Sequence, residues 1–344
     1  MTPMPRVAEA ASRLKLSSLD VSFLGRPANL GLLYYRGRLD PARIYQTILA
    51  TCTHLPSFSS RIVHAPSGEY FLRFQEGDFG FSVEESSRAF APELLERRNL
   101  WSDTLAPYFD TEDTALDRPL FGCRVTLLRE STVLGFSISH SIADGETLKY
   151  ATYLFSALYG NHPVFPASNQ RSFPFQRAGD RPRMPEDYAG WDHRRHELRK
   201  GGEMRRCVCN DIVVRGATVD EVLSAATGPT KLTRSDVVAA LLVKELYPRI
   251  VPGSEVVRLR IPVDLRRATR KLEPTYIGNG YWDAWLHLPI ERFHALDVAG
   301  VAAEIHAAIR RLRTALDRDG FVRLDVDGVD YEAFAGLDPP LSTA

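Results

Sequence analysis

The 344-residue sequence predicts an α/β protein built in two halves. Short runs in which apolar and polar residues alternate, as in half-buried strands, occur in both halves. Runs with apolar residues three and four positions apart, as in helices with one buried face, occur beside them. Between the halves, residues 160–190 are rich in proline and show neither period, which indicates a long connection. We therefore predict an N-terminal lobe over residues 1–160, a crossover linker over 161–200 and a C-terminal lobe over 201–344.

The first half is predicted to contain several strands and two main helices. A helix is expected over Pro41–Thr51, with Asp40 as its N-cap, because its apolar residues fall on one side. The remaining elements follow from shorter patterns. Strands are expected at Leu32–Tyr35, Ser60–His64, Tyr70–Phe74, Phe81–Val83, Cys123–Leu128 and Val133–His140, and a short helix at Pro92–Arg97. The last two strands are expected to pair through the polar turn between them.

The most informative segment is the hexapeptide His140–Gly145, which reads H-x-x-x-D-G. Before it, apolar and small residues alternate, so we expect a strand with one apolar face and with the His140 ring pointing inward. After it, helical spacing predicts a helix over Glu146–Tyr159 with Asp144 as its N-cap. A histidine at such a turn can accept a proton from an alcohol or an amine, and the reference pKa of ~6.5 leaves neutral imidazole available near pH 7. The same pattern fits a buried structural histidine and a simple helix cap, so the hexapeptide alone does not distinguish a catalytic role from a structural one.

The second half resumes both periods after a polar helical stretch at Glu186–Lys200. Its strongest helix is expected over Thr233–Leu246, where Thr233 and Asp236 form a variant of the capping box. A long amphipathic helix is expected over Val298–Leu316. The other expected elements are a short helix at Val219–Ala226 and strands at Cys207–Arg215, Val256–Val263 and Tyr276–Leu288.

Composition narrows the range of partners. Lys and Arg together number 43, as do Asp and Glu, so the formal net charge of zero gives no support for nucleic acid or an anionic membrane. No apolar run reaches the ~18 residues that a membrane span needs, and Met1–Leu16 lack the apolar core of a signal peptide. The four cysteines form no disulfide framework, and Cys207-x-Cys209 lacks the spacing of a zinc site. We therefore expect a cytoplasmic protein without a nucleic-acid, membrane or metal partner.

Several segments, taken in chain order, resemble the motifs of BAHD-type acyltransferases. These enzymes belong to the wider superfamily of chloramphenicol acetyltransferases and peptide-synthetase condensation domains. The ordered set spans more than 260 residues and is far more specific than the hexapeptide alone. The segments are Leu16–Asp20 (L-S-x-x-D), Asp117–Leu120 followed by Cys123–Thr126, His140–Gly145 (H-x-x-x-D-G), Leu232–Ala240, and Val263–Arg266 (V-D-x-R) followed by Tyr276–Tyr281.

The resemblance implies a layered α/β fold of two chloramphenicol-acetyltransferase-like lobes, with mixed sheets and a tunnel between the lobes. It implies that His140 is the general base that moves an acyl group from acyl-CoA to the hydroxyl or amine of a small, specialised-metabolite acceptor. It implies that Asp144 and Gly145 are structural at the active site, and that Asp144 pairs with an arginine, for which Arg266 occupies the matching place. Arg266 also fits a surface charge in the basic run at 266–271. Acyl-CoA is then a co-substrate held by unassigned residues, and neither a metal nor a permanently bound cofactor is implied.

One family segment is missing from the sequence. The D-F-G-W-G motif found near the C-terminus of family members has no counterpart before Ala344. The resemblance therefore implies a C-terminal lobe that is incomplete relative to the family. A shortened lobe would leave a sheet edge that a partner or self-association could cover.

Three functions remain open from the sequence. The first is acyl-CoA-dependent O- or N-acyl transfer to a small molecule. The second is a condensation-type reaction that takes its acyl group from a carrier protein, although those domains usually begin the motif with two histidines and this chain has Ser139-His140. The third is a degenerate protein that binds a ligand without catalysis. Tyr281, Trp282 and Trp285 fit either the lining of an acceptor pocket or ordinary core packing.

Overall fold

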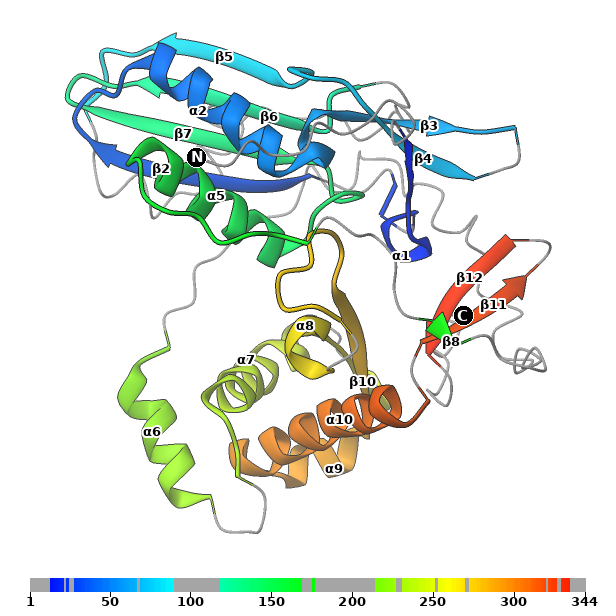
Figure 1. Ribbon diagram of the computed structural model, residues 1–344. Helices are drawn as coiled ribbons and strands as arrows, with labels where there is room; N and C mark the ends of the chain where they lie inside the picture. Colours follow the sequence, from blue (N-terminus) through cyan, green and yellow to red (C-terminus); the bar gives the residue numbers. More distant parts are fainter. Residues whose placement is uncertain are drawn as a thin grey trace.

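Strands in the described part of the chain form four sheets, and helices pack beside two of them (Figure 1). Of the strand expected at 207–215, residues 214 and 215 alone lie in this part, and they form no strand. The short helix expected at 92–97 and the polar helical stretch at 186–200 lie outside it. Within it, no helix is both long enough and apolar enough to cross a bilayer. The computed structural model describes residues 13–21, 23–24, 28–66, 69–89, 118–168, 175–176, 214–226, 231–250, 253–269, 272–319, 321–326 and 329–334.

The first half is organised around a four-stranded mixed sheet. In spatial order its strands are β2 (Asn29–Arg36), β7 (Ser131–Ile138), β6 (Phe121–Leu127) and β5 (Gly80–Glu85). β5 runs parallel to β6, and the other neighbours are antiparallel. The helices α2 (Pro41–His54) and α5 (Gly145–Tyr159) lie together on one face of the sheet (Figure 1). The predicted pairing of the two strands before the hexapeptide is confirmed.

The central strand β7 differs from its prediction in two ways. All eight of its residues are buried, so both faces of the strand are covered and not only the apolar one. A central strand is bonded along both edges, and small residues such as Gly135 and Ser137 expose little surface even where they do not face the helices. The strand also ends at Ile138, because Ser139 and Ile142 form a turn closed by a 3.1 Å backbone hydrogen bond. His140 therefore lies on a turn and not within the strand.

Two predicted helix caps are confirmed. The Asp40 carboxylate accepts a hydrogen bond from the Ala42 amide at 3.0 Å, where α2 begins. The Asp144 carboxylate accepts one from the Thr147 amide at 2.9 Å, where α5 begins. Each side chain satisfies a backbone N–H that the first helical turn leaves without a partner.

A smaller antiparallel sheet joins the N-terminal segment to the first half. Its strands are β1 (Arg13–Lys15), β4 (Tyr70–Phe74) and β3 (Ser60–His64), in that spatial order. The last two match their predicted bounds. The one-turn helix α1 (Ser18–Val21) follows β1, and the 3-10 turn η2 (Pro56–Ser59) precedes β3.

The second half is built on the antiparallel pair β9 (Val256–Asp264) and β10 (Tyr281–Pro289). Helices pack around this pair and bury apolar residues against it. The helices are α6 (Gly216–Ala225), α7 (Arg234–Ile250), α8 (Leu265–Ala268), α9 (Ile290–Ala295) and α10 (Val298–Asp319).

The predicted capping box is confirmed at the start of α7. The Thr233 amide donates to Asp236 at 2.8 Å, and the Asp236 amide donates to the Thr233 hydroxyl at 3.2 Å.

The strand expected at Tyr276–Leu288 begins five residues late, at Tyr281. Tyr276 forms an isolated β-bridge with Ser168 outside the named strands, and residues 277–280 form a loop before β10. The Arg266 side chain donates hydrogen bonds to two backbone carbonyls of this loop, those of Tyr276 and Gly278. These carbonyls are therefore unavailable to a strand ladder.

A fourth sheet draws on the region that we expected to be an irregular linker. The two-residue strand β8 (Phe175–Gln176) runs parallel to β11 (Phe321–Val326). β11 pairs in turn with β12 (Val329–Phe334) in an antiparallel hairpin. The linker region thus supplies an edge strand to a sheet formed near the end of the chain.

The aromatic core of the first half gives a direct test of this packing. Phe121 is 1% exposed, and its ring lies 4.9 Å from that of Phe58 and 5.9 Å from that of Phe136. We expect Phe121→Ala to lower the free energy of unfolding by about 3–5 kcal/mol, measured by urea denaturation, because it opens a cavity. Phe165, which is 69% exposed, is the matched control, and Phe165→Ala should change the value by less than about 0.5 kcal/mol. Equal losses in the two variants would contradict this assignment of the core.

Candidate active site

His140 lies on the turn between β7 and α5 and is half-buried. The Phe23 ring stacks on the imidazole, with centroids 4.1 Å apart and planes 8° apart. The Tyr281 ring, at the start of β10, lies 6.3 Å from the imidazole. On its Nδ1 side, the imidazole meets the Asn279 side chain, whose Oδ1 lies 3.2 Å away. Aromatic rings and one amide thus enclose His140, and they come from both halves of the chain.

The Asn279 amide has only one orientation that fits its neighbours. Its Nδ2 donates to the His140 carbonyl at 2.7 Å and to Asp20 Oδ1 at 2.9 Å, which identifies the nitrogen end. The oxygen end therefore faces His140 Nδ1. An amide oxygen can only accept, so Nδ1 carries the hydrogen and donates it. Neutral His140 then bears its basic lone pair on Nε2, the atom that can take a proton.

A buried ion pair fixes the other end of the hexapeptide. Asp144 is 3% exposed and Arg266 is 8% exposed. Arg266 Nη1 lies 2.8 Å from Asp144 Oδ2, and Nη2 lies 3.1 Å from Oδ1, which is a bidentate contact. Burial alone lowers the pKa of the Arg266 guanidinium, but the Asp144 and Asp264 carboxylates outweigh burial and hold that pKa above its usual value. Arg266 therefore keeps its charge, and it is no surface residue of the basic run at 266–271.

The same two side chains bind the loop at 276–280. Arg266 donates from Nε to the Tyr276 carbonyl at 2.8 Å and from Nη2 to the Gly278 carbonyl at 2.9 Å. Asp144 Oδ2 accepts from the Gly280 amide at 2.9 Å. Asn279 lies between these anchored residues, so its position against His140 follows from the ion pair.

Two glycines in this loop have steric reasons to be glycine. Gly278 adopts φ +140°, a conformation that side chains rarely allow. A Cβ on Gly280 would lie 2.7 Å from the Arg266 guanidinium carbon, closer than any real contact. Gly145, which the resemblance marks as structural, is different: it is the first residue of α5, and a Cβ there would meet nothing within 4 Å.

Some of these residues were predicted from the sequence and others were not. His140, Asp144, Gly145 and Arg266 were predicted, and the structure gathers them around one turn. Asn279 and Asp20 were not, although both fall within segments that resemble family motifs. Phe23 follows no pattern that marks it.

The three aromatic residues left open by the sequence divide between the two alternatives. Tyr281 lies beside His140 and Phe23, as its ring distances of 6.3 and 5.5 Å show. Trp282 packs against an apolar cluster of the second half that includes Leu312. Trp285 has its ring 6.2 Å from that of His287, further along β10.

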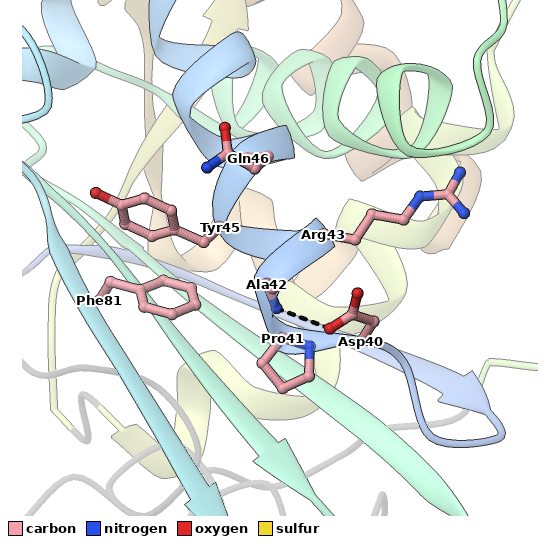
Figure 2. A pocket seen from close by; sticks show the side chains of 7 residues that line it. All are labelled: Asp40, Pro41, Ala42, Arg43, Tyr45, Gln46 and Phe81. Carbon is pink, nitrogen blue, oxygen red and sulfur yellow. Dashed lines mark hydrogen bonds between the residues drawn. The ribbon is translucent and has the colours of Figure 1, made fainter.

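His140 lines neither of two pockets on the surface of the described residues. The first, of about 510 Å³, is formed by the start of α2 and by Phe81 of β5, as Figure 2 shows. The second, of about 730 Å³, is lined by Arg266 and Arg267 on one side and by Asp317 of α10. The tunnel implied by the resemblance remains a prediction, and neither pocket supports the placement of a ligand at His140.

Comparison with solved structures identifies the fold. The crystal structure of F. graminearum TRI101 complexed with coenzyme A and T-2 mycotoxin matches with a TM-score of 0.66 and 14% sequence identity, over 88% of this chain and 77% of that chain. The first condensation domain of the calcium-dependent antibiotic synthetase matches with a TM-score of 0.56 and 18% identity, over 90% and 77%. Polyketide synthase associated protein 5 from Mycobacterium tuberculosis matches with a TM-score of 0.55 and 16% identity, over 88% and 73%.

These likenesses confirm the predicted fold class, a mixed α/β architecture with several sheets that is shared with a condensation domain and with TRI101. No protein-family model and no curated protein sequence matches the chain. At such low identities a shared fold carries no activity with it.

The ion pair generates a stability prediction. We expect Asp144→Ala to lower the free energy of unfolding by about 3 kcal/mol, because it leaves part of a buried guanidinium uncompensated and removes the cap of α5. Glu146, in the first turn of α5, is the matched control, since its pairs with Lys149 and Arg267 are partly exposed. Glu146→Ala should cost less than about 1 kcal/mol. Urea denaturation of both variants decides the matter, and a harmless Asp144→Ala would show that the pair is not a structural anchor.

The two glycines make a second matched comparison. Gly280→Ala should destabilise the protein by more than about 2 kcal/mol, because the new methyl group displaces Arg266 from the ion pair. Gly145→Ala should leave stability unchanged or raise it by up to about 1 kcal/mol, since alanine favours a helix and finds open space. Thermal unfolding of the two variants measures the difference, and a reversed order would contradict the loop geometry.

Proposed function

We propose that the chain transfers an acyl group from an acyl-CoA thioester to the hydroxyl or amine of a small-molecule acceptor, in the manner of BAHD-type acyltransferases. The observation that carries this proposal is the hydrogen bond from His140 Nδ1 to Asn279, which makes Nε2 the unprotonated, basic nitrogen of the imidazole, at the meeting point of the two halves. The likeness to TRI101, whose structure holds coenzyme A and a T-2 mycotoxin molecule, supports the choice of donor and of acceptor class.

In this proposal His140 moves one proton in each direction. Nε2 takes the proton of the acceptor hydroxyl or amine while the oxygen or nitrogen attacks the thioester carbonyl. The tetrahedral intermediate then collapses, the carbon–sulfur bond breaks, and His140 returns the proton to the departing thiolate of coenzyme A. No covalent acyl-enzyme forms, and acyl-CoA enters as a co-substrate.

Asp144 and Arg266 take no part in the bond changes. Their charges compensate each other in a buried pair, and their free hydrogen-bonding groups bind the loop at 276–280. Their role is to hold Asn279 against His140. Gly145 is the first residue of α5, and a Cβ there would meet nothing within 4 Å.

A donor bound to a carrier protein is the second candidate. The likeness to a condensation domain favours it, at a TM-score of 0.56. Ser139 precedes His140, where such domains usually carry a second histidine, and this favours free acyl-CoA.

The test is acceptor-dependent release of thiol. Purified protein is offered acetyl-, malonyl- and aromatic acyl-CoA with a pool of alcohols and amines, and free coenzyme A is measured with a thiol reagent. We expect His140→Ala to lower the rate by about 10²–10⁴-fold, the usual contribution of a general base. His294→Ala, which removes an exposed histidine from α9, should keep the wild-type rate.

Two results would contradict the proposal. Release that persists in His140→Ala would remove His140 from the chemistry. Transfer from a carrier-bound thioester, with none from any acyl-CoA, would establish the second candidate instead.

A further inference from the structure

Asp20, from the N-terminal part of the first half, lies on the side of Asn279 that faces away from His140. Asp20 belongs to the one-turn helix α1 and is 0% exposed. Its Oδ1 accepts from Asn279 Nδ2 at 2.9 Å and from the Asn279 amide at 3.3 Å. Its Oδ2 accepts from the Ser17 amide at 3.3 Å. Residues 259 positions apart in the sequence thus meet at this point.

Asp20 acts as an acceptor in all three of these contacts. In each of them a nitrogen donates and a carboxyl oxygen accepts. Three donors directed at two oxygens suit a carboxylate, which only accepts. A negative charge on Asp20 would therefore be separated from the His140 imidazole by the side-chain amide of Asn279 alone.

We propose that Asp20 is a positioning residue for His140: its carboxylate holds Asn279 in the orientation that receives His140 Nδ1–H and stabilises the imidazolium formed during transfer. Two contacts set that orientation, one to Asp20 and one to the His140 carbonyl. The carboxylate attracts the positive charge that appears when Nε2 takes a proton, and the buried surroundings screen this attraction less than water does.

Among the described residues that the contacts above place near the imidazole, Asp20 is the one that brings a charge to it through Asn279. Tyr281 faces it from β10 with a phenol, which is neutral at pH 7. Asp144 and Arg266 lie at the other end of the hexapeptide and compensate each other. Phe23 covers one face of the ring. Asp20 is thus the charge that reaches His140 through Asn279.

This inference rests on the proposed function only for its effect on rate. Its direct readout is the titration midpoint of His140, followed by NMR of 15N-labelled protein and identified by the signal lost in His140→Ala. We expect Asp20→Asn, which removes the charge and keeps the shape, to lower this midpoint by about one pH unit, because the imidazolium loses a stabilising neighbour. The acidic limb of the pH–rate profile should move to lower pH by the same amount, and kcat should fall by up to about tenfold.

Asp236→Asn is the matched control. Like Asp20, Asp236 is buried, and the backbone amide of each donates to a hydroxyl three residues earlier, on Ser17 and on Thr233. Asp236 also lies beside a histidine, with its Oδ2 2.9 Å from His306 Nδ1. This variant should leave the His140 midpoint unchanged. A midpoint that is equal in wild type and Asp20→Asn would overturn the proposal, as would an equal fall in both variants.

A measurement on the unaltered protein covers the case in which Asp20→Asn does not fold. The 13C signal of the Asp20 carboxylate should shift at the midpoint of His140, since two coupled groups sense each other's charge reciprocally. No shift at that midpoint would overturn the proposal. Both titrations can be read whether or not thiol is released, so the failure of this inference and the failure of the proposed function are distinguishable.

Discussion

The arrangement around His140 depends on the buried ion pair between Asp144 and Arg266. Asp144 caps α5 and so fixes where the helix begins after the hexapeptide turn. Arg266 donates hydrogen bonds to two carbonyls of the loop at 276–280, and Asp144 accepts one from the Gly280 amide. A buried pair of this kind is stable only when its remaining hydrogen-bonding groups are satisfied, and here the backbone of the loop satisfies them.

The consequence of that anchoring reaches His140 in two steps. The loop carries Asn279, whose amide nitrogen is held by Asp20 and by the His140 carbonyl. Its oxygen then fixes the Nδ1–H form of the imidazole. Segments near residues 20, 140 and 279 are thereby brought to one point, and each half of the chain supplies part of the site.

Local signals in the sequence predicted much of the fold. The caps Asp40 and Asp144, and the capping box at Thr233, depend only on neighbouring residues, and all three are confirmed. The loop at 276–280 was misassigned as strand because its carbonyls bind Arg266, a partner that no local pattern reveals. Asn279 and Phe23 were missed for the same reason, since their contacts with His140 exist only in the folded chain. The pairing of Arg266 with Asp144 was predicted only from the resemblance to the family, because family motifs reflect contacts between residues that are distant in the sequence.

The most direct test of this account is the tautomer of neutral His140, read from the 15N shifts of its two ring nitrogens above the titration midpoint. The geometry predicts that Nδ1 carries the hydrogen and that Nε2 carries none. A neutral imidazole protonated mainly on Nε2 would contradict the account, because the proposed base would then have no lone pair to offer.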